Sequence, residues 1–82
     1  SCFDNQLTTL NVSGATALEG LYCYDNQLTS LDVRNGNNTN CASFICTGNY
    51  QLYCIDVDDD AWSTANWTLI DPQSFFSEDC GM

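Results

Sequence analysis

The chain has 82 residues, and a domain this small buries so little of its unfolded surface that apolar packing alone gives it a marginal core. It contains no His and no Lys, and one Arg against eleven Asp and Glu gives a formal charge of −10 at pH 7. That charge excludes nucleic acids and anionic membranes as good partners, and without imidazole or amine groups the Ser–His, Cys–His and lysine mechanisms lack a general base. No apolar run approaches the roughly 20 residues that cross a bilayer, so we expect no membrane insertion.

Two stretches of the sequence are nearly the same. Residues 2–12 (CFDNQLTTLNV) match residues 23–33 (CYDNQLTSLDV) at eight of eleven positions, 21 residues apart. A looser third copy runs over residues 46–57, with one extra residue between Asn49 and Leu52. A repeat of this length is typical of proteins that stack small units, because one unit cannot bury its apolar side chains alone.

The first copy differs from the second in what precedes it. Leu18 and Leu21 come before Cys23, whereas the first copy starts at Cys2 without such a half. We therefore expect an uncovered edge strand over Leu7 and its apolar neighbours. Either upstream repeats of a longer protein or another copy of this chain would cover it.

Alternation of apolar and polar residues predicts two short strands in each unit, one over Leu21-x-Cys23 and one over Leu31-x-Val33. Stacked units would align equivalent apolar residues in three rows, namely Leu7, Leu28 and Leu52; Leu10, Leu31 and Ile55; and Val12, Val33 and Val57. One Asn of each unit falls where the chain bends, where its amide can bind backbone groups that would otherwise be buried unpaired. The expected structural ladder consists of Asn5, Asn26 and Asn49.

The spacing of residues 18–28, LxxLxCxxNxL, returns over residues 41–49 as CxxFxCxxN. It resembles the leucine-rich repeat with Cys at a position that Leu often holds, and in detail the CxxNQLTSLDVS repeats of secreted flavobacterial surface proteins. The segment from Cys54 to Cys80 resembles the part that closes such arrays. The resemblance implies a β-rich, leucine-rich-repeat-like solenoid, with about three turns of 21–24 residues over residues 1–57, the first truncated, and a C-terminal cap with a short helix over residues 58–82.

Six Cys in a short chain without Lys favour an oxidising, extracellular setting. Cys2, Cys23 and Cys46 share one inward position of the repeat, where we expect buried thiols that are not paired. Cys41 falls at the inward position of Leu18, so it is either another core thiol or the partner of a neighbouring one.

The remaining two cysteines are expected to form a disulfide. Cys54 aligns with Thr9 and Ser30, which are outward positions of the second strand, and the closing segment can reach it there. Its expected partner is Cys80, and this bridge would fasten the cap over the last turn.

The acidic run Asp58-Asp59-Asp60 predicts the start of a helix, because carboxylates are favourable beside the free amides of a first turn. The side chains expected to cover the open end of the stack are Trp62, Trp67, Ile70 and either Phe75 or Phe76.

An alternative use of the acidic residues is a Ca²⁺ site. Asp56, Asp58 and Asp60 alternate along the chain and would supply oxygen ligands. The sequence lacks the following Gly and Glu of an EF-hand loop, which counts against this site. We expect no other cofactor.

The outward positions of the first strand in each unit collect aromatic and apolar residues. They are Phe3, Tyr22, Tyr24 and Ile45, flanked by Asp4 and Asp25. Such a face suits a sugar or a peptide, yet neighbouring aromatic side chains also stabilise a sheet without any ligand. Carboxylates in adjacent strands, such as Asp4 and Asp25, lie only about 5 Å apart and leave no cleft for a sugar ring, so we do not expect an enzyme.

These features favour a non-catalytic extracellular repeat module, the C-terminal part of a larger cell-surface or secreted protein, that presents a strand face to a protein or glycan ligand in adhesion. The alternative is a structural subunit whose uncovered first unit docks on another copy and builds a filament or surface layer.

Glycosylation sequons begin at Asn11, Asn37 and Asn66, and whether they are used depends on the host.

Overall fold

The computed structural model describes residues 6–81, so the expectations for Cys2, Phe3, Asp4 and Asn5 fall outside the described range. Within that range the chain forms seven short strands in two sheets, a 3-10 helix and an α-helix. Sheet A contains β1 (Thr9–Asn11), β3 (Ser30–Asp32), β5 (Cys54–Asp56) and β7 (Phe75–Ser77), and sheet B contains β2 (Gly20–Tyr22), β4 (Ser43–Cys46) and β6 (Leu69–Ile70). The helices are η1 (Asn38–Asn40) and α1 (Asp60–Asn66).

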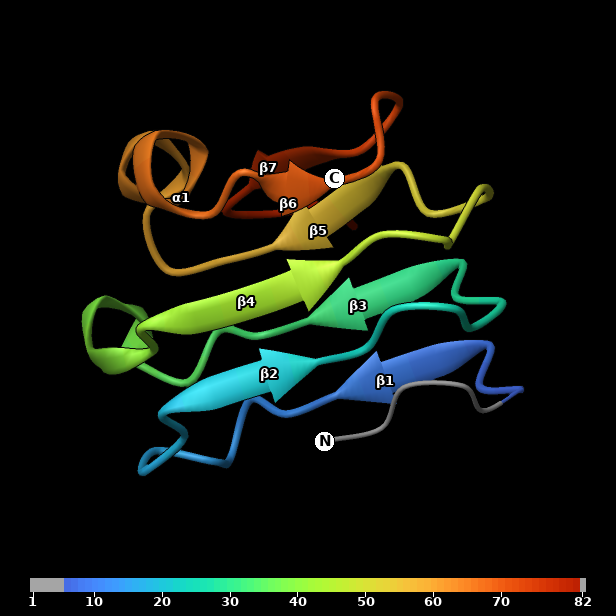
Figure 1. Ribbon diagram of the computed structural model, residues 1–82. Helices are drawn as coiled ribbons and strands as arrows, with labels where there is room; N and C mark the ends of the chain where they lie inside the picture. The colour runs from blue at the N-terminus through green and yellow to red at the C-terminus, as the bar shows by residue number, and fades with distance from the viewer. Residues whose placement is uncertain (1–5, 82) are drawn as a thin grey trace.

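The chain passes alternately from one sheet to the other, and the strands of each sheet are parallel (Figure 1). In sheet A, Leu10 pairs with Leu31, Leu31 with Ile55, and Ile55 with Phe76. The first three of these residues hold the same position in the three copies of the repeat. Successive copies therefore lie in register, and the expected short strands and short C-terminal helix are confirmed; the parallel pairing is a finding of the structure.

Side chains between the two sheets form the core. Its innermost aliphatic residues have an exposure of 0 or 1% and are Leu28, Leu31, Val33, Leu52, Ile55 and Val57. The equivalent residues of the first copy, Leu7, Leu10 and Val12, are only partly buried. Their exposure follows from the position of β1, which is an outermost strand of sheet A in the described range.

Buried Asn side chains organise the bends that lead from sheet B to sheet A. Oδ1 of Asn26 accepts a hydrogen bond from the backbone N–H of Leu7 at 3.4 Å, and Oδ1 of Asn49 accepts one from Leu28 at 3.2 Å. Both Asn side chains donate through Nδ2 to the carbonyl oxygen of Cys23 at 3.0 Å. Each Asn thus connects its own bend to the preceding one and pairs backbone groups that are buried or partly buried.

Asp71 continues this arrangement at the last bend, a role that the sequence analysis did not predict. Its carboxylate is buried and accepts hydrogen bonds from the backbone N–H groups of Gly48 at 3.0 Å and Asn49 at 2.7 Å. The hydroxyl of Ser74 donates to the carbonyl oxygen of Leu52 in the same region. The last bend is therefore held by different residue types from those of the repeat.

A second polar cluster organises the bend between β3 and β4, and it too was not predicted. Nδ2 of the buried Asn38 donates to the carbonyl oxygen of Val33 at 2.7 Å and to Oδ1 of Asn35 at 2.9 Å. The carboxylate of Asp58, from the next unit, accepts hydrogen bonds from the N–H groups of Gly36 and Asn38, both at 3.1 Å.

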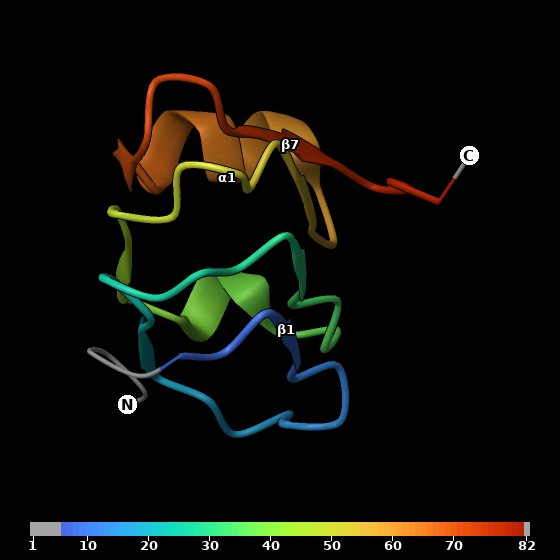
Figure 2. The same cartoon turned by 90° about the vertical axis from the view of Figure 1, so that its right-hand side faces the viewer.

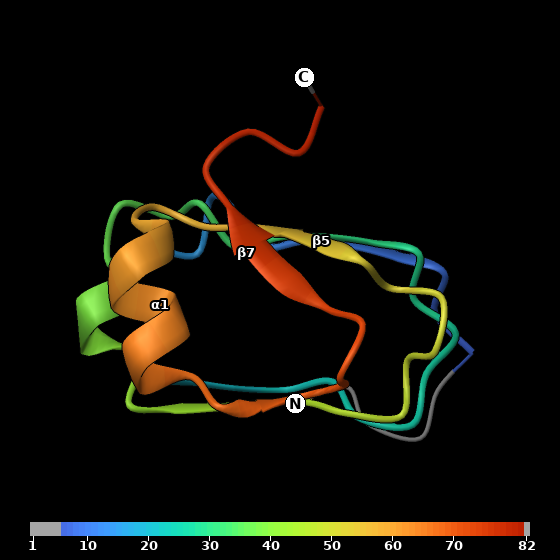
Figure 3. The ribbon, with the colours of Figure 1, turned by 90° about the horizontal axis from the view of Figure 1, so that it is seen from above.

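The C-terminal segment closes one end of the molecule, with β1 toward the other end (Figure 2). The helix begins as expected, because Oδ1 of Asp59 accepts hydrogen bonds from the N–H groups of Ala61 and Trp62 at 3.1 and 3.2 Å. Beyond the helix, the segment also contains β6, which pairs with β4, and β7, which pairs with β5. Seen from above, β7 runs obliquely across the space between the sheets (Figure 3), so the segment both extends the sheets and covers them.

Aromatic packing holds this segment on the core. The Trp67 ring stacks on Phe44 with centroids 4.4 Å apart, and its Nε1 donates to the carbonyl oxygen of Cys41 at 3.0 Å. Phe76 packs edge-on against both rings. Of the two Phe residues proposed for this position, Phe76 is therefore the buried one, while Phe75 is exposed.

Candidate functional site

The outward face of sheet B carries an apolar row. In its three parallel strands Tyr22 pairs with Ile45, and Ile45 pairs with Leu69. The ring of Tyr22 lies over Gly20, because a Cβ atom there would come within 3.3 Å of the ring. Leu69 is 52% exposed, although an aliphatic side chain gains free energy from burial. We call the row Tyr22, Ile45 and Leu69 the sheet B face.

A shallow depression of about 270 Å³ follows this row. The side chains of the sheet B face line it together with Asn66, Trp67 and Thr68, which come from the end of α1 and the residues after it. Its walls therefore combine apolar surface with an amide and a hydroxyl. This mixture is typical of small recognition sites, where a few polar groups fix the orientation of a ligand.

The outward face of sheet A is different in chemistry. One of its rows pairs Asn11 with Asp32, Asp32 with Asp56, and Asp56 with Ser77. Arg34 lies over this row, donating to both carboxylate oxygens of Asp32 at 3.0 and 2.9 Å. These hydrogen bonds hold the pKa of Asp32 below its usual value. The groups of this row are thus largely paired with one another.

The residues expected to form the binding face do not all gather in one place. Tyr22 and Ile45 are neighbours in sheet B and line the same depression. Tyr24 and Asp25 follow the end of β2 and are not among the residues that line it, while Phe3 and Asp4 lie outside the described residues. Asp25 has a positive φ of 59° and is a residue of the bend.

Leu69 is a member of this surface that the sequence analysis did not identify. It lies in the two-residue strand β6, which is too short to give a clear alternation. Trp67 and Ile70, which lie close to it in sequence, face the core. An outward position for Leu69 between them is the sequence signal that could have identified it.

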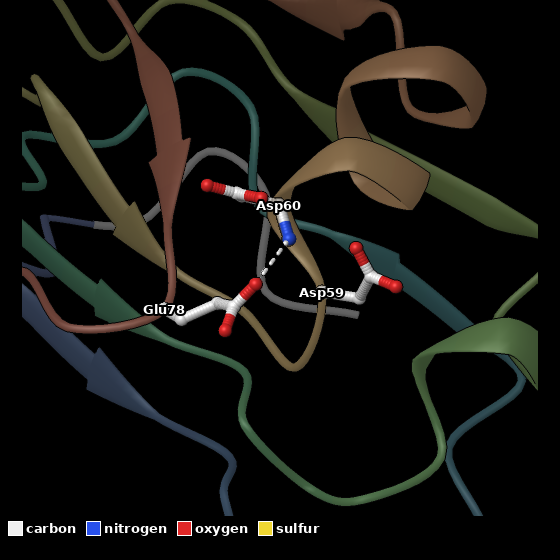
Figure 4. A group of neighbouring side chains, drawn as sticks. All are labelled: Asp59, Asp60 and Glu78. Atoms are coloured by element: carbon white, nitrogen blue, oxygen red, sulfur yellow. Dashed lines mark hydrogen bonds between the residues drawn. The ribbon is translucent and has the colours of Figure 1, made fainter.

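The three Asp residues considered for Ca²⁺ are not brought together as a group in the structure. Oδ1 of Asp56 accepts a hydrogen bond from the N–H of Cys80 at 2.6 Å, and Asp58 binds the backbone of the bend between β3 and β4. Among the described residues, the acidic side chains that do converge are Asp59, Asp60 and Glu78, all exposed. Figure 4 shows Glu78 at the start of α1, where its Oε2 accepts a hydrogen bond from the N–H of Asp60 at 3.3 Å.

The cysteines have two kinds of environment. Cys54 and Cys80 form the expected disulfide, 26 residues apart in sequence. Cys23 and Cys46 are fully buried in the core, as is nearly all of Cys41. Burial raises the pKa of the Cys41 thiol, which keeps it protonated and unreactive.

Comparisons with protein-family models, with curated proteins and with solved structures give no match. In the described part of the chain, neither helix has the length and apolar character that spanning a membrane requires. The function therefore has to be argued from the chemistry of the surfaces.

Proposed function

We propose that the protein is a non-catalytic binding module and that the sheet B face receives a protein or glycan ligand. The observation that carries this proposal is the contrast between the charged row of sheet A and the outward face of sheet B. On sheet A, charged groups are paired with one another through Arg34. On sheet B, Ile45 and the half-exposed Leu69 remain in contact with solvent beside a depression. Contiguous apolar surface of this kind commonly marks interaction sites.

We further propose that the fold is a short solenoid of the leucine-rich-repeat type, in keeping with the resemblance of the sequence. Support comes from the register, which stacks Leu10, Leu31 and Ile55, and from the Asn side chains that connect successive bends. Stacked units of this kind create flat sheet faces that are well suited to binding.

An extracellular setting is the third part of the proposal. The Cys54–Cys80 disulfide supports it, because such bonds persist mainly in oxidising compartments. In this setting the module would belong to a larger surface or secreted protein, where a further unit would cover the partly buried Leu7, Leu10 and Val12.

The test uses two collections of defined ligands, a random-peptide display library and an array of purified glycans. Both are probed with the wild-type chain and with Leu69→Glu, which places a charge in the apolar row. The proposal expects peptides or glycans that bind the wild type and lose at least about tenfold in affinity to the variant.

Thr9→Glu is the matched control, because it adds the same charge at an exposed strand position of sheet A. Its binding should equal that of the wild type. Equal loss in both variants would indicate a general charge effect, and the absence of any Leu69-dependent ligand from both collections would overturn the proposal.

The filament hypothesis has one supporting observation, which is that β1 is an outermost strand of sheet A in the described range and that its central residue, Leu10, is only partly buried. Head-to-tail stacking would require the opposite end to accept this strand. That end is covered by α1 and β7 (Figures 2 and 3), so we favour the binding module. Light scattering and electron microscopy of the purified chain distinguish them, since filaments with a rise of a few repeats would support the structural subunit.

A further inference from the structure

The bend after β4 is one residue longer than the bend after β2, and the extra length places an aromatic ring in solvent. The second copy reads Asn26-Gln27-Leu28, whereas the third reads Asn49-Tyr50-Gln51-Leu52. Asn49 and Leu52 are both fully buried, so the longer bend has to bulge outward between them. As a result Tyr50 is 80% exposed, the largest exposure among the large apolar side chains of the described residues.

Tyr50 lines a pocket between the two bends. This pocket has a volume of about 210 Å³ and is lined by Asn26, Gln27, Tyr50 and Gln51. It is smaller than the roughly 300 to 1,000 Å³ of sites that enclose drug-sized ligands, so it suits one ring of a longer molecule. The bends lie above one another along the side of the molecule opposite α1, away from the helix that borders the sheet B face (Figures 1 and 3).

Two amide side chains in this pocket are available to a ligand. None of the hydrogen bonds of the described residues uses the side chain of Gln27 or Gln51, and both residues are exposed. The Gln of the following bend behaves differently, because Nε2 of Gln73 donates to the carbonyl oxygens of Asn49 and Leu52 at 3.0 Å. Gln73 therefore supports the backbone, whereas Gln27 and Gln51 each present donors and an acceptor at the surface.

We propose that this pocket binds a neutral carbohydrate. A sugar ring has a flat apolar face of C–H groups, which packs on an aromatic ring, and hydroxyls at its edge that both donate and accept hydrogen bonds. Tyr50 supplies the ring, and Gln27 and Gln51 supply the complementary amides. Among the described residues, the side chains that line the pocket carry no charge, so these residues offer an ionic ligand little. The site is separate from the sheet B face and does not depend on its function.

The experiment uses a panel of neutral oligosaccharides, namely cellohexaose, chitohexaose, laminarihexaose, mannohexaose and xylohexaose. Each is titrated into the full chain, with affinity measured by calorimetry and location by ¹H–¹⁵N NMR. The expected result is that at least one sugar binds and shifts the side-chain NH₂ signals of Gln27 and Gln51. Tyr50→Ala should weaken that binding about tenfold or more, since it removes the stacking surface.

Tyr53→Ala is the matched control, because Tyr53 is also exposed, at 57%, but does not line the pocket. Its affinity should equal that of the wild type, as should that of Leu69→Glu. The proposal is overturned if no sugar of the panel binds, or if Tyr50→Ala and Tyr53→Ala lose affinity equally. Binding that Leu69→Glu abolishes and Tyr50→Ala preserves would also overturn it and would place the glycan on the sheet B face.

Discussion

Gly48 lies so close to Asp25 that a Cβ atom on Gly48 would be 2.5 Å from Oδ1 and 3.0 Å from the backbone nitrogen of Asp25. Both residues have positive φ angles, 75° for Gly48 and 59° for Asp25. The two bends that carry them therefore approach each other through backbone, and a side chain at position 48 would separate them. This contact explains why Gly stands immediately before the buried Asn49.

Gly48→Ala is expected to destabilise the protein more than Gly36→Ala. Gly36 has the same φ of 75°, but a Cβ atom there would meet open space. Gly36→Ala should thus cost about 1 kcal/mol for the left-handed conformation, while Gly48→Ala adds roughly 1 to 3 kcal/mol for the overlap. Urea denaturation of both variants measures the difference, and equal stabilities would contradict the close approach at Asp25.

Asn49→Ala should lower the free energy of unfolding by about 3 kcal/mol, because it removes several hydrogen bonds from buried backbone groups at once. The N–H of Leu28 loses its bond to Oδ1 of Asn49, and the carbonyl oxygens of Cys23 and Cys46 each lose the bond from its Nδ2, although Asn26 still donates to Cys23. Asn66→Ala is the control, since that Asn is exposed and donates one hydrogen bond, to the carbonyl oxygen of Trp62. Thermal and urea denaturation should show a loss well below 1 kcal/mol for the control. A similar loss in both variants would show that the bends do not depend on the Asn ladder.

The repeated string determined how much of this fold the sequence could predict. Because two copies agree at eight of eleven positions, aligning them predicted which residues of β1 and β3 pair and which face the core. The outward position of Cys54 followed from the same alignment, and Cys80 was expected as its partner because the closing segment can reach that position. Periodicity predicts well wherever each unit uses the same residue for the same contact.

What could not be predicted lies where the repeat uses different residues. Asp71 holds the last bend with a carboxylate instead of an amide, and Asp58 binds the bend of the preceding unit. In the sequence both appear as surface carboxylates, and the alternation of Asp56, Asp58 and Asp60 made Asp58 a candidate ligand of the alternative Ca²⁺ site. The contacts of β6 depend on packing against β4, which no local pattern reveals in a strand of two residues.

Removal of the Cys54–Cys80 disulfide should lower the free energy of unfolding by roughly 3 to 4 kcal/mol, because the bridge closes a loop of 26 residues that the unfolded chain would otherwise leave open. The double variant Cys54→Ser/Cys80→Ser is compared with the wild type by urea denaturation, with and without reductant. Reductant should destabilise the wild type and leave the double variant unchanged. Were the reduced and oxidised wild-type proteins equally stable, the bridge would have no part in holding the C-terminal segment.

The ion pair of Asp32 and Arg34 predicts a pH dependence with a defined sign. Hydrogen bonds from Arg34 lower the pKa of Asp32 in the folded state. The pair therefore stabilises the fold above the carboxyl pKa of the unfolded chain, about 3.9, and this contribution is lost as the pH falls through the lower, folded value. Arg34→Gln should reduce the melting temperature at pH 7, and the difference from the wild type should shrink toward pH 2. Thr64→Glu is the control, because it makes the same change in net charge at an exposed position of α1 without touching the pair. If both variants show the same pH profile, the effect belongs to the overall negative charge and not to Arg34.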